Sequence, residues 1–260
     1  MVGIGDSVWR ELLVEGNPGK EKSRAVFRAI PSDPRCMFCH APFEGLGRRV
    51  MPLIGRGQSH EDPRFCNSCI NFGRKHPGGA EVEVATMFAD VRGSTPLAEK
   101  IGNKAFRDLI DRFFRTSSEV LVRSGALLGR LAGDEAIGYF VPGIAGPMYA
   151  RAALNSARDL LIATGHTDPK GPWIPLGVGL HAGRGYVGML GSPGEPMELT
   201  ALGDDINVGA RISDAAGVGE ILASLQLAEA ADAAIDGLER RDLILKGKEG
   251  SMEVVVLTVR

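Results

Sequence analysis

The stretch EVEVATMFADVRGST, residues 81–95, decides the fold predicted for this chain. β-Branched and aromatic residues recur at every second position, at Val82, Val84, Thr86 and Phe88. This period predicts a β-strand, and the few polar side chains on its other face indicate a buried one. The strand ends at Asp90, before a turn that contains Gly93. A carboxylate beside free N–H groups of a turn suits a hard cation carrying a polyphosphate, and an aspartate that caps the turn is the alternative.

Length and composition place the chain among globular proteins. Its 260 residues suit one good-sized domain with an appendage, and 44% hydrophobic and 24% charged residues are ordinary values. The net charge of −2 gives no reason to expect bulk binding to nucleic acid or to an anionic membrane. No apolar run approaches the about 18 residues of a membrane span, and residues 1–25 lack a signal-peptide core. We therefore expect a cytosolic protein without a membrane span.

All the cysteines lie in two CxxC pairs separated by 26 residues: Cys36, Cys39, Cys66 and Cys69. Two such pairs around a loop of this size are typical of a structural zinc site with four cysteine ligands, because one tight turn brings both sulfurs of a pair to a single ion. The loop has too few apolar residues to fold without the cross-link that a bound ion supplies. A redox-active dithiol pair or an iron–sulfur cluster is the alternative. Nearby histidines are expected at the surface rather than as ligands: His40, His60 and His76.

The chain divides into three predicted units. Residues 1–32 carry an apolar cluster at helical spacing, from Val8 to Leu13, which predicts a docking helix. Residues 33–79 form a small four-cysteine module resembling a zinc ribbon, and residues 70–80 are predicted to be a linker at its end. The domain with candidate catalytic residues spans residues 81–260.

The predicted elements from residue 81 onward follow the order β-α-β-β-α-β-β-α. This order favours an α+β fold with helices on one face of a mostly antiparallel sheet. Helices are expected from Asn103 to Gly125, at 149–161, from Gly203 onward, and up to about 235. Strands are expected at 126–132 and 135–141 around a Gly133-Asp134 turn, at 174–191 as a hairpin turning at 183–185, at 220–222, and as two closing strands around 245–250.

Further candidate residues lie downstream of Asp90. In a β-α-β-β unit the end of the first strand and the tip of the following hairpin meet at one edge of the sheet, so Asp134 is expected near Asp90. Two carboxylates there suit a pair of Mg²⁺ ions. Asn207 and Arg211 are four residues apart and share a helix face, where the guanidinium is well shaped to grip phosphate oxygens. Lys246 lies in a basic turn that is a plausible phosphate anchor.

Five stretches in order carry a family resemblance: FADVRGST (88–95), GRLAGDEA (129–136), GLHAGRGYVG (179–188), ALGDDINVGAR (201–211) and LKGKEG (245–250). With them the chain from about residue 81 to residue 260 resembles the catalytic domain of a class III nucleotidyl cyclase. The resemblance implies a ferredoxin-like α+β fold that works as a head-to-tail homodimer with two composite sites. The N-terminal 80 residues lie outside it.

The resemblance also implies a role for each candidate residue. Asp90 and Asp134 correspond to the aspartates that bind two Mg²⁺ or Mn²⁺ ions, and Val91 to a further ligand through its backbone carbonyl. Asn207 and Arg211 correspond to the pair, from the opposite subunit, that steadies the ribose and the transition-state phosphate. Lys246 corresponds to the lysine that holds the triphosphate. The implied reaction is cyclisation of a nucleoside triphosphate with release of pyrophosphate, in which both ends of an in-line displacement are held.

Two positions depart from the pattern of many adenylate cyclases. Arg130 and Thr200 stand where those enzymes read adenine with a lysine and an aspartate. Neither supplies the carboxylate that guanine readers commonly carry, so hydrogen-bond polarity favours ATP and 3′,5′-cyclic AMP. The alternatives are a guanylate cyclase or a catalytically silent nucleotide-binding domain. A nucleic-acid-binding role for the four-cysteine module is disfavoured, because residues 33–79 hold only seven Lys and Arg against four Asp and Glu.

Overall fold

The computed structural model describes residues 4–16, 18–30, 32, 34–191, 197–244 and 250–259, and of residues 4, 5, 18, 20 and 130–132 it describes the backbone only. The strands are β1 (Gly78–Val91), β2 (Leu127–Ala132), β3 (Glu135–Phe140), β4 (Leu176–Leu190), β5 (Glu198–Leu202), β6 (Glu220–Ser224), β7 (Arg240–Leu243) and β8 (Met252–Thr258). The longer α-helices are α2 (Pro18–Ala29), α4 (Asn67–Lys75), α5 (Ser94–Ile101), α6 (Asn103–Arg123), α8 (Tyr149–Ala163) and α9 (Asp204–Ala215). Shorter helical segments are α1 (Ile4–Arg10), a π-helical turn (Glu11–Glu15), α3 (Leu46–Val50), a 3₁₀ turn (Met51–Ile54), α7 (Pro142–Ala145) and α10 (Leu225–Ala230).

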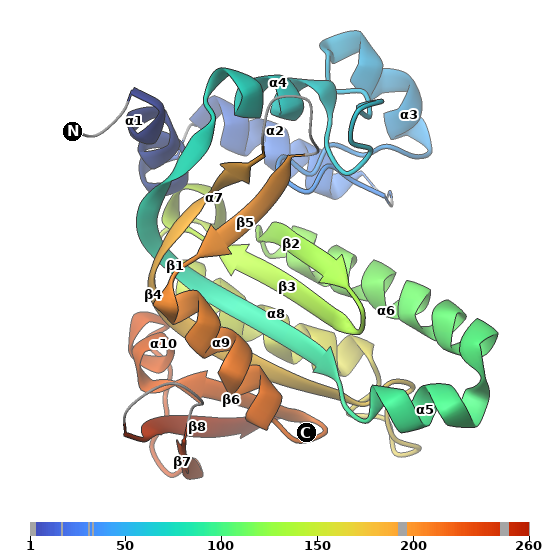
Figure 1. The fold of residues 1–260 in the computed structure, drawn as a ribbon, viewed down its shortest axis with the longest axis vertical. Helices are drawn as coiled ribbons and strands as arrows, with labels where there is room; N and C mark the ends of the chain where they lie inside the picture. The colour runs from blue at the N-terminus through green and yellow to red at the C-terminus, as the bar shows by residue number, and fades with distance from the viewer. Residues whose placement is uncertain are drawn as a thin grey trace.

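One sheet organises the described part of the chain, with β1 and β4 at its centre (Figure 1). Its order is β2-β3-β1-β4-β6-β8-β7, and β5 pairs with the far end of β4. All neighbours are antiparallel except β4 and β6. The prediction of a mostly antiparallel α+β fold is therefore confirmed.

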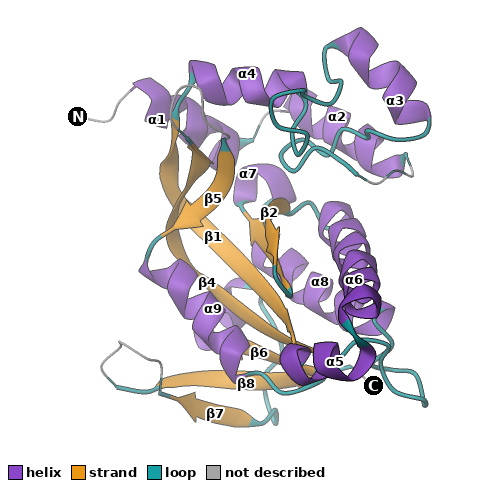
Figure 2. Cartoon of the chain, turned by 45° about the vertical axis from the view of Figure 1, so that its right-hand side comes forward, coloured by secondary structure: helices purple, strands orange, loops and turns teal. Residues whose placement is uncertain are grey.

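Strand β1 is buried on both faces, as its composition predicts. One face packs into a core that includes α6 and α8, through Ala85, Met87 and Ala89. Helix α9 lies on the other face (Figure 2). There its Gly209 approaches Thr86 and Phe88. The expectation that the helices cover one face only was thus wrong. A Cβ atom at Gly209 would lie 2.4 Å from Thr86 Oγ1, so this close approach of α9 to the sheet requires a glycine.

The predicted hairpin at 174–191 is a single strand, β4, which pairs with the whole of β1. Gly183 and Gly185 therefore serve packing rather than a turn. A Cβ atom at Gly183 would lie 2.3 Å from Asp205 Oδ2, and one at Gly185 would lie 2.7 Å from Ile206 Cδ1. These glycines leave room for the first turn of α9. The sequence suggested a turn at these positions because it does not show that a helix packs against the strand there.

The predicted linker at 70–80 is also wrong. Helix α4 occupies its first half, and β1 begins at Gly78. Ile70 is buried, and the ring of Phe72 packs edge-on against Trp9 at 5.1 Å between centroids. The predicted docking helix is confirmed, because Trp9 is fully buried in the segment from α1 to Glu15 and its Nε1 donates to His76 O at 2.8 Å. The helix expected to reach about 235 ends earlier, at Ala230.

A second hydrophobic cluster joins the N-terminal part of the chain to the sheet. Its buried members come from α1, the cysteine loops, α4, β1, β2, β3, β4 and β5, and include Trp9, Phe38, Phe65, Val84, Leu127, Tyr139 and Val187. The predicted units thus share a core, although their boundaries remain a prediction. In the part of the chain that the structure describes, no helix has the length and hydropathy that a membrane span requires.

Candidate active site and cysteine cluster

The end of β1 and the tip of the β2–β3 hairpin meet, as the sequence predicts. Asp90 pairs in register with Glu135, the first residue of β3. The amide of Val91 donates to the carbonyl oxygen of Asp134 at 3.1 Å. Gly133 precedes Asp134 with a φ of 67°, which gives the tight turn its left-handed residue. Asp90, Val91 and Asp134 therefore lie at one corner of the sheet.

Arg92 links this corner to helix α9. Its guanidinium forms an ion pair with the Asp90 carboxylate. Its Nη1 also donates to the carbonyl oxygens of Ser213 at 3.3 Å and Asp214 at 3.2 Å, at the last turn of α9. A cation at the C-terminal end of a helix is favourable. No sequence pattern pointed to this role of Arg92, although the residue lies within the stretch 81–95.

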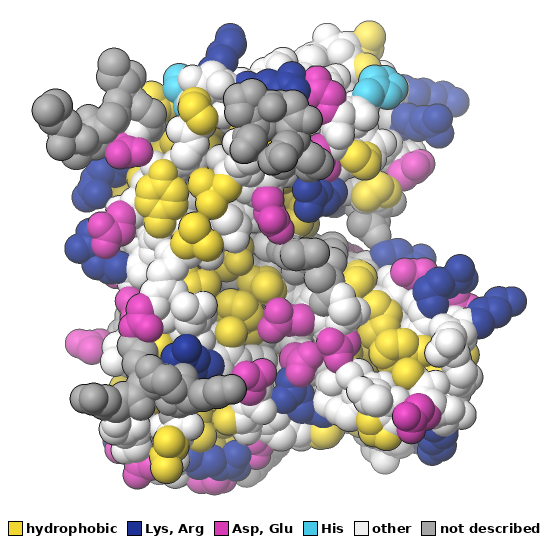
Figure 3. Space-filling view, viewed as in Figure 1, with side chains coloured by type: hydrophobic (Ala, Val, Ile, Leu, Met, Phe, Trp, Pro, Cys, Tyr) yellow, Lys and Arg dark blue, Asp and Glu magenta, His cyan; other side chains and the backbone are white. Residues whose placement is uncertain are grey.

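Negative charge is concentrated at this corner. The pKa of Glu135 is raised by burial and then by the neighbouring carboxylates of Asp214 and Asp134. Burial lowers the pKa of Arg92, whose side chain is 17% exposed. Figure 3 shows acidic side chains gathered over the ends of β1 and β3, beside a basic one. A set of carboxylate and carbonyl oxygens is the donor set that Mg²⁺ and Mn²⁺ prefer, so these residues fit such ions.

Asn207 and Arg211 lie on α9, as predicted. Asn207 is exposed, and Arg211 is half-buried with an Nη1 atom that has no hydrogen-bond partner among the described residues. Asn207 precedes Ser213 by six residues, about 9 Å along the helix axis. Arg92 holds the Ser213 end of α9 beside Asp90, so Asn207 lies toward the opposite end of the helix.

The two predicted purine-reading positions are on neighbouring strands. Thr200 lies on β5, where its side chain lies beside the Tyr139 hydroxyl, and burial raises the pKa of that hydroxyl. Arg130 lies on β2, which contacts β5, but its side chain is outside the described part of the structure. Lys246 also falls outside the described residues.

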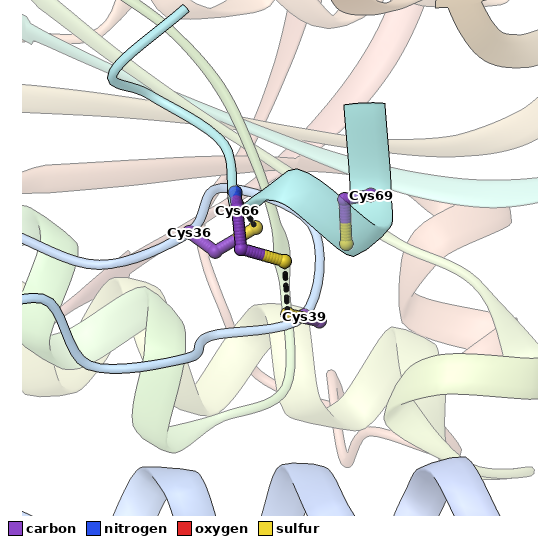
Figure 4. Close-up of side chains that lie close together, drawn as sticks. All are labelled: Cys36, Cys39, Cys66 and Cys69. Atoms are coloured by element: carbon purple, nitrogen blue, oxygen red, sulfur yellow. Dashed lines mark hydrogen bonds between the residues drawn. The ribbon is translucent and has the colours of Figure 1, made fainter. Parts of the chain in front are cut away.

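The four cysteines converge into one buried cluster between the first knuckle, Cys36–His40, and the start of α4 (Figure 4). Their sulfur atoms all lie within 4.8 Å of one another, and Cys39 Sγ is 3.6 Å from Cys66 Sγ. The amide of Cys66 donates to Cys36 Sγ at 3.3 Å. The prediction that both CxxC pairs meet is confirmed, and this donor set can hold a metal ion.

Two arginines lie beside the sulfurs. Arg56 interacts electrostatically with Cys39, Cys69 and Cys66, and Arg24 does so with Cys39 and Cys69. Arg24 is 3% exposed, and burial lowers its pKa. Buried cations require compensating negative charge, which a set of thiolates supplies. The arginines therefore suit a cluster that carries net negative charge.

The expectation that His40 is a surface residue was wrong. Its side chain is fully buried, and its Nε2 lies 2.8 Å from the carbonyl oxygen of Ala126. Burial lowers the pKa of His40 to about 4, so the ring is neutral at pH 7. His40 does not belong to the cysteine cluster but contacts the start of β2. His60, by contrast, is exposed and His76 is half-buried.

Comparison with known proteins gives no matching family model. An uncharacterised protein of Mycobacterium tuberculosis is 29% identical over 185 residues, which are 70% of this chain and 33% of that protein. An adenylate cyclase of Mycobacterium bovis is 28% identical over 142 residues, which are 54% of this chain and 31% of that protein. The chain thus spans about a third of the length of these curated relatives.

Solved structures match more completely. The guanylyl cyclase Cya2 superposes with a TM-score of 0.62 at 20% identity, over 70% of this chain and 95% of that one. The adenylyl cyclase CyaB from P. aeruginosa gives 0.57 at 23% identity, over 69% and 96%. The guanylate cyclase domain of RhGC from Catenaria anguillulae, solved with GTP, gives 0.58 at 22% identity, over 69% and 98%. With its central β1 and β4, the chain therefore has the fold of a class III adenylyl or guanylyl cyclase catalytic domain.

Proposed function

We propose that this protein is an adenylate cyclase that converts ATP to 3′,5′-cyclic AMP and pyrophosphate. The observation that carries the proposal is the Val91–Asp134 hydrogen bond, which places two aspartates of the predicted site at one corner of a cyclase fold. The burial of Glu135 beside Asp214 and Asp134, which raises its pKa, supports it, because carboxylates gathered at a sheet corner suit a bound cation.

Asp90, Asp134 and the carbonyl of Val91 would hold two Mg²⁺ or Mn²⁺ ions. Such ions lower the pKa of the ribose 3′-hydroxyl and neutralise the triphosphate. Arg211 donates to the charge that develops on the α-phosphate, Asn207 orients the ribose, and Lys246 holds the triphosphate. One hydrogen-bond donor of this kind contributes about 3 kcal/mol to lowering a barrier.

The active form is a head-to-tail homodimer with two composite sites. Asn207 is exposed and lies toward the end of α9 that is remote from Asp90. This placement favours a site in which Asp90 of one chain works with Asn207 of its partner, and the resemblance to class III cyclases assigns Arg211 to the same side as Asn207. A two-fold interface then produces two equal sites.

ATP is the favoured substrate on hydrogen-bond polarity. Thr200 offers a hydroxyl that accepts from the adenine amino group, and Arg130 offers donors to adenine N1. The solved relatives include both adenylyl and guanylyl cyclases, so guanylate cyclase activity is the alternative.

The cysteine cluster is proposed to hold one structural Zn²⁺ ion. A tetrahedral zinc with bonds of about 2.3 Å keeps its sulfurs about 3.8 Å apart, close to the 3.6 Å between Cys39 and Cys66. An iron–sulfur cluster of four irons spreads its thiolates over separate metal atoms and suits this tight set less well.

One experiment tests the activity. Purified protein is incubated with Mn²⁺ or Mg²⁺ and with ATP or GTP in separate reactions, and the product is identified by mass. Cyclic AMP and pyrophosphate from ATP are expected. Formation of cyclic GMP alone would establish the guanylate alternative, and no product from either nucleotide would support a silent nucleotide-binding domain.

A further inference from the structure

The first cysteine knuckle, Cys36–His40, is hydrogen-bonded to strand β2. The amide of Leu128 donates to the carbonyl oxygen of Met37 at 3.2 Å. His40 Nε2 lies 2.8 Å from the carbonyl oxygen of Ala126, and because a carbonyl only accepts, Nε2 carries the proton of this bond. Two backbone groups at the start of the strand are therefore held by a loop that lies far away in the sequence.

Backbone hydrogen bonds hold the conformation of this knuckle, which carries two of the four cysteines. The amide of His40 donates to Cys36 O at 2.9 Å, and the amide of Met37 donates to Arg64 O at 3.0 Å. His40 has a φ of 63°, a left-handed conformation that a non-glycine residue keeps only when its surroundings hold it. An ion bound by all four sulfurs would fix this loop relative to α4.

Strand β2 becomes irregular directly after the anchored residues. Leu128 opposes Gly138 and Leu131 opposes Ala136, so Gly129 and Arg130 together oppose a single residue of β3. A bulge of this kind changes the direction of side chains and leaves part of the ladder unpaired. The pairs Leu128–Gly138 and Leu131–Ala136 bracket position 130, and the contacts at Ala126 and Leu128 add a restraint from outside the sheet.

Hydrophobic packing is a second connection between the knuckle and the predicted purine-binding pocket. Leu127 opposes Tyr139 across the β2–β3 pair. The Tyr139 hydroxyl lies beside the Thr200 side chain, and both Leu127 and Tyr139 belong to the hydrophobic cluster that contains Phe38 and the cysteines. A shift of the knuckle would therefore move groups on both sides of the pocket.

We infer that the first cysteine knuckle is a positioning element for the catalytic domain, so that metal occupancy of the four-cysteine cluster sets the geometry of the β2–β3 hairpin that carries Arg130 and Asp134. The inference rests on the proposed cyclase function for its effect on turnover. Its structural part, the link between the metal and β2, stands independently of that function. The module then acts as a metal-dependent input to the active site, with His40 as the positioning residue.

The structural part is tested by amide hydrogen exchange on zinc-loaded protein and on the same protein after treatment with a chelator. Loss of zinc is expected to raise exchange in residues 126–130 at least tenfold, because Leu128 loses its acceptor. Exchange in β8, which is remote from the module, should stay unchanged, and added Zn²⁺ should restore protection. Equal exchange at 126–130 with and without zinc would overturn the inference.

The functional part is tested with two substitutions at one position. His40→Leu removes the bond to Ala126, and His40→Gln keeps an amide donor in its place. The leucine variant should retain zinc, lose about fivefold in kcat/KM and change its ATP-to-GTP ratio, whereas the glutamine variant should stay within about twofold of wild type. Leu257→Ala is the control, because it removes buried packing from β8 without touching the knuckle or its bond to β2.

The outcomes separate the two proposals. If Leu257→Ala changes the nucleotide ratio as much as His40→Leu, the effect is general destabilisation and the positioning role is excluded. If wild-type protein turns over neither nucleotide, the cyclase proposal fails. In that case the exchange measurement still decides whether zinc controls β2, since it requires no turnover.

Discussion

The amide of Val91 and the carbonyl oxygen of Asp134 are joined by a 3.1 Å hydrogen bond. This bond ties the exit of the central strand to the tip of a hairpin that is formed later in the chain. Two candidate metal ligands, Asp90 and Asp134, are thereby held together by backbone structure and not by their own side chains. Substitutions of the carboxylates should therefore change chemistry with little effect on the fold.

Asp90→Ala and Asp134→Ala are each expected to lower cyclase activity at least about a hundredfold, because each removes a proposed metal ligand. Activity with Mn²⁺ and ATP is measured beside circular dichroism, which should be unchanged. Asp159→Ala, on the exposed face of α8, is the matched control and should keep full activity. Near-normal turnover in either Asp90→Ala or Asp134→Ala would contradict the two-metal assignment.

Mixed dimers test the composite site. Asp90→Ala and Arg211→Ala homodimers should both be inactive. In a dimer with one chain of each kind, one site carries both lesions and the other is intact. Random pairing on co-expression makes half of the dimers mixed, so activity should recover to about a quarter of wild type. Inactive dimers that are demonstrably mixed would show that the site lies within one chain.

The purine pocket is tested by installing the commoner adenine-reading pair. Thr200→Asp combined with Arg130→Lys should keep or sharpen the preference for ATP over GTP, because the carboxylate accepts from the adenine amino group and the ammonium donates to N1. The ratio of kcat/KM for the two nucleotides is the measurement. A shift toward GTP would mean that these two positions do not face the base as proposed.

The metal content of the cysteine cluster is expected to be one zinc per chain. Elemental analysis of protein purified under reducing conditions measures it. Replacing Cys36 and Cys39 by serine should lower the zinc content toward zero. It should also destabilise residues 33–79 more than the sheet, because the thiolates bind the ion that cross-links this module. Detection of iron, or of no metal in the wild-type protein, would exclude the zinc assignment.

Acid should weaken the contact between β6 and β7. Arg241 donates two hydrogen bonds to Glu220, at 2.7 and 2.8 Å, and lowers the pKa of that carboxyl below its ordinary 4.5. The stabilisation is therefore present above pH 4.5 and lost as the pH falls through the lowered value. Arg241→Gln should reduce the free energy of unfolding by about 1 to 2 kcal/mol at pH 7, and the difference should shrink toward pH 3.

Urea unfolding of wild type and variant at both pH values measures this difference. Arg240→Gln is the matched control, because its pair with Glu253 is more exposed and should contribute less than about 0.5 kcal/mol. An equal loss for the Arg241 variant at pH 3 and pH 7 would contradict the role of the ionised Glu220.

The sequence predicted those features that depend on local pattern. The alternation from Val82 to Phe88 predicted β1, and the Gly133-Asp134 turn placed Asp134 beside Asp90. Spacing also predicted the meeting of the four cysteines. Each of these features depends either on residues that are close in sequence or on the order of a few strands and helices along the chain.

The features that the sequence did not predict depend on partners distant along the chain. Gly183 suggested a turn, yet it is a contact point for Asp205 within a long strand. His40 suggested a surface residue, yet it reaches Ala126 in β2. Helix α4 was mistaken for a linker because Trp9, which covers Phe72, lies in another segment. Close packing of this kind leaves no periodic signal.

The hydrophobic cluster shared by the cysteine loops and the sheet determines what is exposed when the N-terminal segment is removed. A chain shortened to residues 78–260 would lose the covering of Val84, Leu127 and Val187 and would leave Leu128 without its acceptor. Strand β2 closes one side of the sheet, and an uncovered apolar edge strand pairs readily with another chain. The shortened protein is therefore expected to self-associate through β2, because the N-terminal segment no longer covers this edge of the sheet.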